Sequence, residues 1–401
     1  MQRRSHIFPT YAPPAIQFER GEGVRLWDTE RREYLDFISG ISVNTLGHAH
    51  PDLIKSLENQ AQKLWHLSNM FDVPGQSELA DRYCELSFAD RIFFANSGAE
   101  AVECALKAAR RYHFEKGEPD RIEIIGFDGA FHGRTYATIN AAGNPNYLKG
   151  FGPALPGYTK LPFGDMNAFQ NALSDKTAAV IIEPVQGEGG LRPVPLADLT
   201  LMRKLCTEAG ALLIYDEVQC GAGRTGKLFA HEWAQDATPD LMATAKGVGG
   251  GFPLGMTFST EEVAQYMVPG THGTTYGGNA LAVAVGHAVL DHISKPNFLR
   301  HVETVSEQIR DGFEAIKSEV SDSIVDVRGK GLLIGAKLAV SNIAVRDATR
   351  DLGLLIGVAG DNVVRLAPAL NVSSVDVEEA INRLRKALIS VKSQESEKEL
   401  V

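Results

Sequence analysis

One lysine of the chain stands where a side chain could take part in covalent chemistry. A short apolar run at residues 241–245 is typical of a strand, and Lys246 follows it directly. The glycines that come next leave the backbone free to approach a ligand closely. An earlier apolar run at 211–215 indicates a buried parallel strand, and Asp216 follows it. Polar groups just past the carboxyl ends of such strands are where open α/β sheets bind ligands.

The combination of Lys246 and Asp216 suits Schiff-base chemistry. A lysine amine that is partly desolvated, with positive charge or polar walls around it, loses its proton near neutral pH and becomes a nucleophile. Asp216 could keep a pyridinium nitrogen protonated, which turns a pyridoxal ring into an electron sink. A lysine before a glycine is otherwise typical of a solvated helix C-terminus, and the pair alone favours that interpretation. The remaining segments of the chain favour the Schiff-base interpretation instead.

The turn after residues 91–95, which predict a further strand, is typical of an anion site. Ser97 and Glu100 form an S-x-x-E capping box at the start of a helix that we expect to reach Phe114. The free N–H groups and the dipole of a helix N-terminus favour a phosphate there. A plain, well-capped helix is the alternative, and the segment alone favours it.

Further strands at 122–125 and 179–182 and a helix at 198–208 continue the alternation, which predicts an α/β sheet with right-handed crossovers. Glu183 again places an acid at a strand end. Such an acid is usually solvated, but here it belongs to one of four polar strand ends that should converge on one rim.

Phe131 and Arg134 lie in one turn between these strands. The phenyl ring could stack on a heteroaromatic ring, and the guanidinium could bind a carboxylate through two hydrogen bonds. As isolated residues, both would more often be core filler and surface charge.

The composition indicates an ordinary globular enzyme. The 401 residues are 44% hydrophobic and 22% charged, and a formal net charge of −10 argues against a nucleic-acid surface. No apolar run approaches the roughly 20 residues that cross a bilayer, and the N-terminus lacks the apolar segment of a secretory signal. We therefore expect a cytoplasmic protein with no membrane partner. The four cysteines show no metal-binding or C-x-x-C spacing and should be reduced, with Cys220 as a packing residue.

His48 and His50 lie two residues apart in the turn at 44–51, before a helix that should begin near Asp52. The pair invites a metal-site interpretation. Because no matching acids or cysteines accompany it, we expect ordinary hydrogen bonding there and no metal.

The length predicts one large and one smaller domain. We expect a segment at 1–60 that joins the small domain, a large domain at 61–297 and a C-terminal small domain at 298–401. Runs at 24–28 and 33–37 predict a strand pair near the start. The C-terminal part should hold helices at 298–319 and 374–393, strands at 323–327, 332–338 and 363–366, and a charged, frayed tail from Ser393.

Eight segments in family order, from about residue 10 to 370, together resemble the class III aminotransferases, a group of fold-type I pyridoxal phosphate (PLP) enzymes that act on acetylornithine and ornithine. They are GEGVRLWDTERREYLDFISGISVNTLGHAHP, FFANSGAEAVECALKAARRYH, FHGRT, EPVQGEGG, LLIYDEVQCGAGRTGKLFAHE, AKGVGGGFPLG, HGTTYGGN and VVRLAP. The resemblance implies a large domain with a mostly parallel seven-stranded sheet and a smaller α+β domain. One departure is alanine at position 280, where many relatives have proline, which changes rigidity rather than chemistry.

The resemblance also implies roles for residues of the site. Lys246 matches the lysine that binds the cofactor aldehyde and later moves the substrate proton, and Asp216 matches the partner of the pyridinium nitrogen. Thr275 matches a hydroxyl that reaches the phosphate in the neighbouring subunit, so a homodimer with shared sites is expected. The cofactor-binding residues implied are Ser97, Gly98, Ala99, Phe131, His132, Glu183, Asp216, Val218, Gln219, Lys246 and Thr275.

Three further residues match groups that handle substrate carboxylates. Arg134 matches the arginine that holds the carboxylate of acetylornithine, and Arg365 the one that binds the α-carboxylate of glutamate. Glu188 matches a carboxylate that pairs with this second arginine until glutamate displaces it. An unpaired buried guanidinium is costly, so such a mobile partner is physically reasonable. A fixed structural ion pair is the alternative.

The implied activity is transfer of the δ-amino group of N2-acetyl-L-ornithine to 2-oxoglutarate, a step of arginine biosynthesis. The same chemistry on ornithine, succinylornithine, succinyl-diaminopimelate or 4-aminobutyrate is the nearest alternative. An aminomutase or decarboxylase of the same fold would not need Arg134, Glu188 and Arg365 together. A PLP-binding scaffold dimer without activity is a further alternative, against which the intact Lys246 and Asp216 argue.

Overall fold

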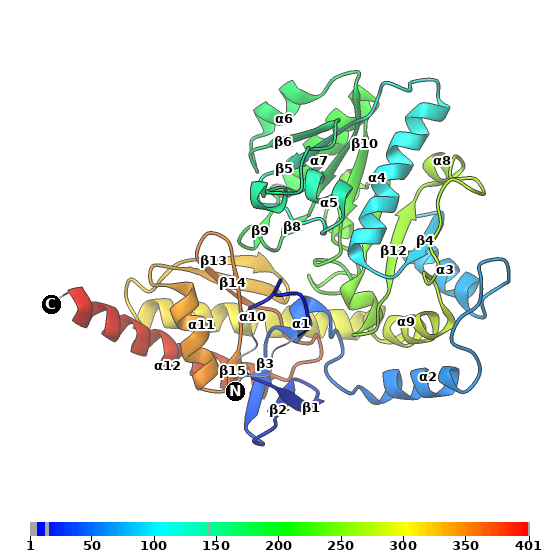
Figure 1. Cartoon of the computed structure of the whole chain (residues 1–401). Helices are drawn as coiled ribbons and strands as arrows, with labels where there is room; N and C mark the ends of the chain where they lie inside the picture. The colour runs from blue at the N-terminus through cyan, green and yellow to red at the C-terminus, as the bar shows by residue number, and fades with distance from the viewer. Residues whose placement is uncertain (1–5, 13–15, 143, 400–401) are drawn as a thin grey trace.

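The structure, a computed structural model, describes residues 6–12, 16–142 and 144–399. Figure 1 shows two parts, one built around a large sheet with helices such as α4 and α7 beside it, and the other around α10 and the strands β13 and β14. The N-terminal strands lie with the second part, close to the C-terminal helices.

The large sheet has seven strands, and all but one run parallel. Only β12 is antiparallel to its neighbours β11 and β4. The expected mostly parallel seven-stranded sheet of fold type I is therefore confirmed. Its order is β4 (Arg91–Ala95), β12 (Gly255–Ser259), β11 (Leu241–Thr244), β10 (Leu212–Asp216), β7 (Thr177–Ile182), β5 (Glu123–Phe127) and β6 (Tyr158–Leu161).

Both faces of this sheet are buried, which explains why its strands are apolar without alternation. In β10, Leu212 and Ile214 belong to the core around α4 (Gly98–Glu115). Leu213 and Tyr215 belong instead to the core that includes α7 (Leu196–Ala209). Because neighbouring side chains point to opposite faces, the whole run is inside, and only its carboxyl end is left for polar groups.

Three further helices, two from the N-terminal part of the chain and one from residues 280–293, complete the core that includes α7. The helix α3 (Gln76–Glu85) and the helix α9 (Ala280–Ile293) contribute buried side chains to it. The helix α2 (Pro51–Ala61) packs on α9, where Ser56 Oγ donates to the carbonyl of Ala284 at 2.8 Å.

Short elements connect these larger ones. They are α1 (Ser39–Ser42), α5 (Tyr136–Ala141), η1 (Pro145–Tyr147), α6 (Met166–Ala172), β8 (Val185–Gln186), β9 (Arg192–Pro193), η2 (Ala230–Trp233), η3 (Gln235–Ala237), η4 (Lys246–Gly249) and α8 (Glu261–Ala264).

The second part has its own antiparallel sheet and its own core. The sheet order is β13 (Ile324–Lys330), β14 (Leu333–Leu338), β17 (Val363–Leu366) and β16 (Gly357–Ala359). Side chains of α10 (Pro296–Glu319) and α12 (Ser374–Glu399) share its core. The helix α11 (Asn342–Asp351) packs beside α12.

Strands from the N-terminal and C-terminal parts of the chain meet in a further sheet. Its order is β1 (Phe18–Glu22), β2 (Arg25–Asp28), β3 (Glu33–Asp36) and β15 (Leu354–Leu355), with β15 parallel to β3. Leu35 and Phe37 lie in the same core as α10 and β14. The N-terminal strands thus pack with the C-terminal part of the chain.

The strands and helices expected from the sequence are present, with boundaries that differ by a few residues. One expectation is wrong. The tail from Ser393 was expected to fray, but the backbone of α12 stays helical to Glu399. The charged residues there are compatible with helix, because Glu and Lys have high helix propensity. The strands expected at 24–28 and 33–37 are the antiparallel pair β2 and β3.

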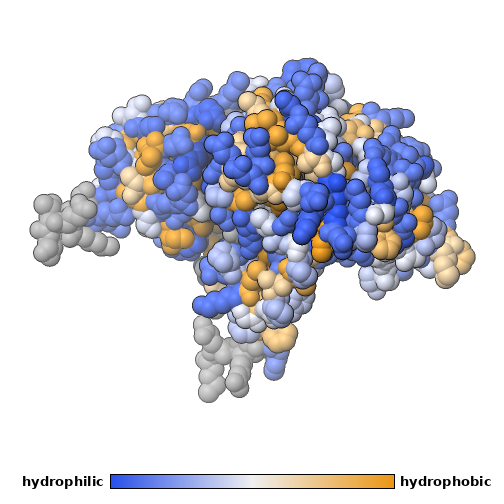
Figure 2. Space-filling model, turned by 90° about the horizontal axis from the view of Figure 1, so that it is seen from above, coloured by the Kyte–Doolittle hydropathy of each residue, from blue (hydrophilic) through white to orange (hydrophobic). Residues whose placement is uncertain are grey.

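The surface is predominantly polar on the face seen in Figure 2, with smaller hydrophobic areas between hydrophilic residues. Among the described residues, no helix is both long enough and apolar enough for a bilayer crossing.

Candidate active site

The carboxyl ends of three neighbouring strands open on one cavity of about 670 Å³. Asp216 ends β10, Glu183 follows β7, and Lys246 comes two residues after β11. All three side chains line the cavity, as do most of the other residues singled out from the sequence. These are Ser97, Gly98, Ala99, Phe131, His132, Arg134, Glu188, Val218 and Gln219.

Lys246 begins η4 with a strained backbone. Its φ of 47° lies in the left-handed region, which residues other than glycine rarely adopt. Such strain is found mainly at functional sites. Burial lowers the pKa of the Lys246 amine, and the positive charge of Arg365 lowers it further, although nearby carboxylates act in the opposite sense. The amine therefore gives up its proton more readily than an exposed lysine, as a nucleophile must.

Asp216 and His132 form a buried pair in the cavity wall. Asp216 Oδ2 lies 2.8 Å from His132 Nδ1, and its Oδ1 accepts a hydrogen bond from the amide of Val218 at 3.0 Å. Burial acts to lower the pKa of His132, but the hydrogen bond and the charge of Asp216 outweigh it, and the pKa is raised. The pair therefore holds the Asp216 carboxylate in a fixed orientation at the cavity.

The acids Glu183 and Glu217 have different surroundings from Asp216. Glu183 accepts hydrogen bonds from the amides of Phe131, at 2.8 Å, and Gly187, at 3.1 Å, and so fixes two turns of the cavity. Burial raises its pKa to about 7. Glu217 points away from the cavity, where it accepts hydrogen bonds from two backbone amides of η2. Of the two consecutive acids after Tyr215, only Asp216 faces the cavity.

Ser97 caps α4 at the opposite wall, as expected from the S-x-x-E pattern. Ser97 Oγ accepts from the amide of Glu100 at 3.3 Å, and the Glu100 carboxylate accepts from the amide of Asn96 at 2.7 Å. The first-turn amides of Gly98 and Ala99 border the cavity. A side chain at Gly98 would meet Val218 Cγ1 at 2.7 Å, so glycine is needed for the helix to approach so closely. This end of α4 can hold a phosphate group.

Gln219 reaches the cavity because Gly187 has no side chain. A Cβ atom at Gly187 would lie 1.4 Å from Gln219 Oε1, so the two positions depend on each other.

An aromatic group and a cation lie at another wall of the cavity. Arg134 Cζ is 4.1 Å from the ring centre of Tyr147 and 5.5 Å from that of Phe131. The two rings meet edge to face at 5.7 Å. Arg134 is exposed apart from these ring contacts, so its guanidinium can bind a carboxylate that enters the cavity.

Arg365 and Glu188 form an ion pair that joins the two parts of the molecule. Arg365 Nη1 donates to Glu188 Oε1 at 2.7 Å. The Arg365 side chain is only 6% exposed, whereas that of Glu188 is 37% exposed. The arginine is therefore held by β17 and its neighbours, while the glutamate lies at the cavity and has room to move.

Two predicted site residues are not among those that line the cavity. Arg365 adjoins it through its ion pair with Glu188. Thr275 lies apart from the group, exposed in the loop before α9.

Some residues at the cavity were not found from the sequence. They include Tyr147, Asn96 and the segment at 40–43. Tyr147 ends the short 3-10 helix η1 and lies at the cavity in contact with Phe131 and Arg134. Asn96 could have been predicted from the sequence as a residue of the site, because it directly precedes the capping box.

Unpartnered polar atoms at the cavity indicate what it can hold. His132 Nε2 and Gln219 Nε2 are buried and have no hydrogen-bond partner among the described residues. Each such group costs about 1–3 kcal/mol, so they are rare without a function. A planar molecule with polar ring substituents and a phosphate would pair with these nitrogens and with the start of α4. The residues present therefore fit a phosphorylated heteroaromatic cofactor.

A reactive lysine after a strand of a mostly parallel sheet, beside a buried carboxylate and a phosphate-binding helix end, defines a PLP-dependent enzyme of fold type I. The chain belongs to the class III aminotransferases, since the family model described as aminotransferase class-III matches residues 8–388. It is therefore a PLP-dependent aminotransferase.

Relatives and solved structures agree with this family. The chain is 55% identical to acetylornithine aminotransferase 2 of Caulobacter vibrioides, over 95% of each chain. The N-acetylornithine aminotransferase of Stenotrophomonas maltophilia is 38% identical, with a TM-score of 0.84 and coverage of 95% of this chain and 98% of that one. The ornithine aminotransferase of Toxoplasma gondii is 31% identical, with a TM-score of 0.92 and coverage of 97% and 94%.

Proposed function

We propose that this enzyme transfers the δ-amino group of N2-acetyl-L-ornithine to 2-oxoglutarate, giving N-acetyl-L-glutamate 5-semialdehyde and L-glutamate. The names of the similar proteins support this choice of donor. A role in arginine biosynthesis and a cytoplasmic location follow from this reaction as parts of the same proposal.

The observation that carries the proposal is the arrangement of two guanidinium groups about the lysine. Arg134 is open to the cavity, whereas Arg365 is occupied by Glu188 at 2.7 Å. While Glu188 neutralises Arg365, the reacting end of the donor can be an uncharged chain with a terminal amine, and the donor's α-carboxylate can bind Arg134. When glutamate or 2-oxoglutarate enters, its α-carboxylate can replace Glu188 on Arg365. One cavity thus serves two substrates of different charge.

The residues that would hold the cofactor come from several elements of the large sheet. Bound PLP supplies an electron sink for the carbon next to the substrate nitrogen. Asp216, held by His132, would keep its ring nitrogen protonated, and the start of α4 would bind its phosphate. Phe131 and Val218 would cover the two faces of the ring, with Gln219 and Glu183 fixing the surrounding turns.

Lys246 has two tasks in this proposal. Its amine would hold the cofactor by a covalent link to the aldehyde carbon in the absence of substrate. When free, the same amine would be the base that takes a proton from the substrate carbon and delivers it to the C4′ carbon of the cofactor. The lowered pKa of Lys246 favours the unprotonated amine, which is the form that can take the proton from the substrate carbon.

We also propose that the protein is a homodimer with shared sites. Large apolar side chains stay exposed near Thr275, among them Trp65, Phe71 and Tyr276. Tyr276 contacts His66 at 5.1 Å between ring centres, so two chain segments form one surface there. A second copy of the chain on this surface would cover the apolar side chains and could bring its Thr275 to the phosphate end of the cavity.

The domain division at 1–60, 61–297 and 298–401 remains part of the proposal. Separate cores in the two parts support it, and Phe298 packs against both of them. In this division Lys246 belongs to the large domain and Arg365 to the small one, so a change in the angle between the domains would alter their separation.

A panel of amino donors tests the proposed substrate. The PLP-loaded enzyme is mixed with each donor in the absence of a keto acid, and the loss of the absorbance band of the lysine-bound cofactor is followed. We expect N2-acetyl-L-ornithine to react with a larger kcat/KM than ornithine, succinylornithine, succinyl-diaminopimelate or 4-aminobutyrate. A larger value for any of these would replace the proposed donor.

The chemistry itself is tested by Lys246→Ala. This variant should lose turnover by several orders of magnitude while it still takes up PLP without the covalent link. The exposed Lys227→Ala serves as a control and should keep full activity. Normal turnover in Lys246→Ala would refute the assignment of the site.

A further inference from the structure

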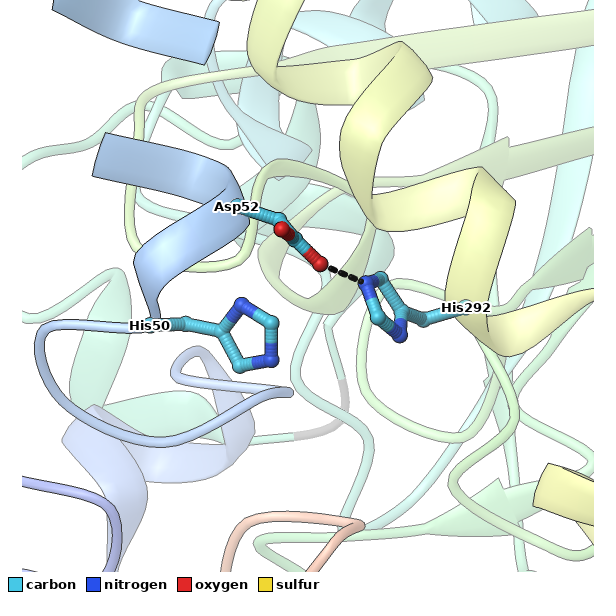
Figure 3. Close-up of side chains that lie close together, drawn as sticks. All are labelled: His50, Asp52 and His292. Carbon is cyan, nitrogen blue, oxygen red and sulfur yellow. Dashed lines mark hydrogen bonds and ion pairs between the residues drawn. The ribbon is translucent and has the colours of Figure 1, made fainter. Parts of the chain in front are cut away.

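A second group of metal-ligating side chains lies outside the active site, where α2 meets α9. His50 is the residue directly before α2, Asp52 is in its first turn, and His292 is in the last turn of α9. Figure 3 shows the three side chains turned toward one another from the two helices. One donor atom from each lies within 4.8 Å of those of the other two.

The contacts between these side chains leave one nitrogen without a partner. His292 Nε2 lies 2.8 Å from Asp52 Oδ2, and the rings of His50 and His292 meet edge to face with centres 4.9 Å apart. His50 Nδ1 is buried and has no hydrogen-bond partner among the described residues. The imidazoles of His50 and His292 face each other without forming a hydrogen bond, so both rings could instead act as ligands of a cation.

The donor set selects the kind of ion. Two imidazoles and one carboxylate are ligands of Zn²⁺ and similar transition-metal ions, whereas Mg²⁺ and Ca²⁺ require mainly oxygen. Ligands of a tetrahedral Zn²⁺ lie about 3.3 Å apart, given bonds of about 2.0–2.1 Å. Since the three donors are already within 4.8 Å, small side-chain rotations reach this geometry, and water can take the fourth position.

We propose that His50, Asp52 and His292 form a binding site for Zn²⁺ or a similar transition-metal ion. The ion takes the place of the hydrogen bond between His292 Nε2 and Asp52 Oδ2, whose proton is released to solvent, and binds His50 at the same time. His292 also lies near the C-terminus of α9, where the helix dipole favours positive charge. This proposal does not depend on the proposed substrate of the enzyme.

The position of the site gives the ion a structural role. It joins the start of α2 to the end of α9, two helices that are otherwise linked by apolar packing and the Ser56 hydrogen bond. The helix α9 also packs on η4, which begins with Lys246. An ion that fixes α9 therefore stabilises the support on which the reactive lysine stands.

The sequence alone gave no reason to expect this site. His48 and His50 are close in sequence, but His48 bonds to Asp36 at 2.8 Å instead. The partner of His50 is His292, which is distant in sequence. We expected ordinary hydrogen bonding and no metal at His48 and His50. His50 instead lies beside Asp52 and His292, and only the folded chain brings these three side chains together.

Zinc binding to the PLP-loaded, tag-free full-length protein tests the proposal. The protein is stripped with a chelator and dialysed, then titrated with Zn²⁺ by calorimetry, and Tm is measured with and without the ion. We expect one Zn²⁺ per chain and a rise in Tm, because an ion that binds only the folded state stabilises it. Mg²⁺ should cause neither effect.

Four variants localise the binding. His50→Gln and His292→Gln should each weaken Zn²⁺ binding at least tenfold and abolish the rise in Tm. Asp52→Asn keeps an acceptor for His292 but removes the charge, and should also weaken binding. His287→Gln is the matched control on the same helix, where His287 bonds to Gly75 and Arg82 instead, and it should bind Zn²⁺ like the unmodified protein.

Two results would overturn the proposal. The first is the absence of Zn²⁺ binding in the unmodified protein. The second is a change of Zn²⁺ binding in the wrong variant. If His50→Gln and His292→Gln bind Zn²⁺ normally, or if His287→Gln loses binding while its PLP absorbance stays normal, the ion is held elsewhere. The PLP absorbance of each variant shows that the fold is intact.

Discussion

At the scale of single residues, the proposed function makes Glu188 and Arg365 the pair that selects the charge of the substrate. They are paired at 2.7 Å, with the guanidinium buried and the carboxylate partly exposed. Replacing Glu188 with Gln keeps the shape but removes the charge, so Arg365 loses its carboxylate partner until a substrate brings one. We expect Glu188→Gln to favour glutamate over N2-acetyl-L-ornithine, changing the ratio of their kcat/KM values by about tenfold or more, which equals roughly 1.4 kcal/mol.

The two half-reactions of this variant are measured separately by the absorbance of the cofactor. Glu208→Gln, an exposed acid of α7, is the control and should leave the ratio unchanged. Equal effects of Glu188→Gln on both substrates would mean that the pair is a fixed structural contact.

His231 makes a contribution of a different kind, to the acid sensitivity of the fold. Burial lowers its pKa to about 4, compared with about 6.5 in an unfolded chain. Between these two values the unfolded chain binds a proton that the folded chain does not, so stability falls as the pH decreases from about 6.5 to 4. Removing the His231 imidazole should reduce this loss of unfolding free energy at low pH by up to roughly 3 kcal/mol.

We therefore expect His231→Gln to flatten the pH dependence of the urea unfolding midpoint below pH about 6.5, relative to that of the unmodified enzyme. His6→Gln changes an exposed histidine and should leave the profile as it is. An unchanged profile in His231→Gln would show that other groups cause the acid sensitivity.

At the scale of elements, the turn after β8 and the turn after β10 fit together only through a glycine. A Cβ atom at Gly187 would lie 1.4 Å from Gln219 Oε1. Gly187→Ala should displace Gln219 from the cavity, shift the absorbance of the bound cofactor and weaken PLP binding about tenfold, which corresponds to the loss of roughly 1.4 kcal/mol.

Equilibrium dialysis and the absorbance spectrum measure this effect. Gly152→Ala is the control, since an added Cβ there would meet only an ordinary contact at 3.9 Å. If Gly187→Ala binds PLP as tightly as this control, Gln219 has no part in holding the cofactor.

The sequence was most informative about individual strands and helices. Buried strands such as β10 could be predicted because both faces are apolar, and the capping box located the start of α4. Contacts between distant segments could not be predicted in this way. Tyr147 reaches the cavity from the end of η1 through its ring contact with Phe131, and the His50–His292 contact depends on how α2 lies on α9. No periodicity in the sequence encodes such contacts.

At the scale of the whole molecule, the exposed loop with Thr275 makes the proposed dimer testable. Thr275→Ala should leave the dimer intact but weaken PLP binding about tenfold or more, because a hydrogen bond to a charged group contributes roughly 1.5–3 kcal/mol. Trp65→Glu places a charge on the apolar surface and should shift the protein toward monomer, with loss of PLP at the same time.

Sedimentation velocity and equilibrium dialysis report the two effects. Thr207→Ala, an exposed threonine of α7, is the control for Thr275→Ala. Tight PLP binding by a monomeric Trp65→Glu variant would argue that each site is complete within one chain.

The pairing of β3 with β15 has a consequence for biosynthesis on the ribosome. Leu35 of β3 pairs with Leu354 of β15, so the first strands emerge long before their partner is translated. At typical rates of 5–20 residues per second, β3 waits on the order of 15–60 s. During this time its edge is open to other nascent chains, which makes the newly made N-terminus a natural substrate for molecular chaperones.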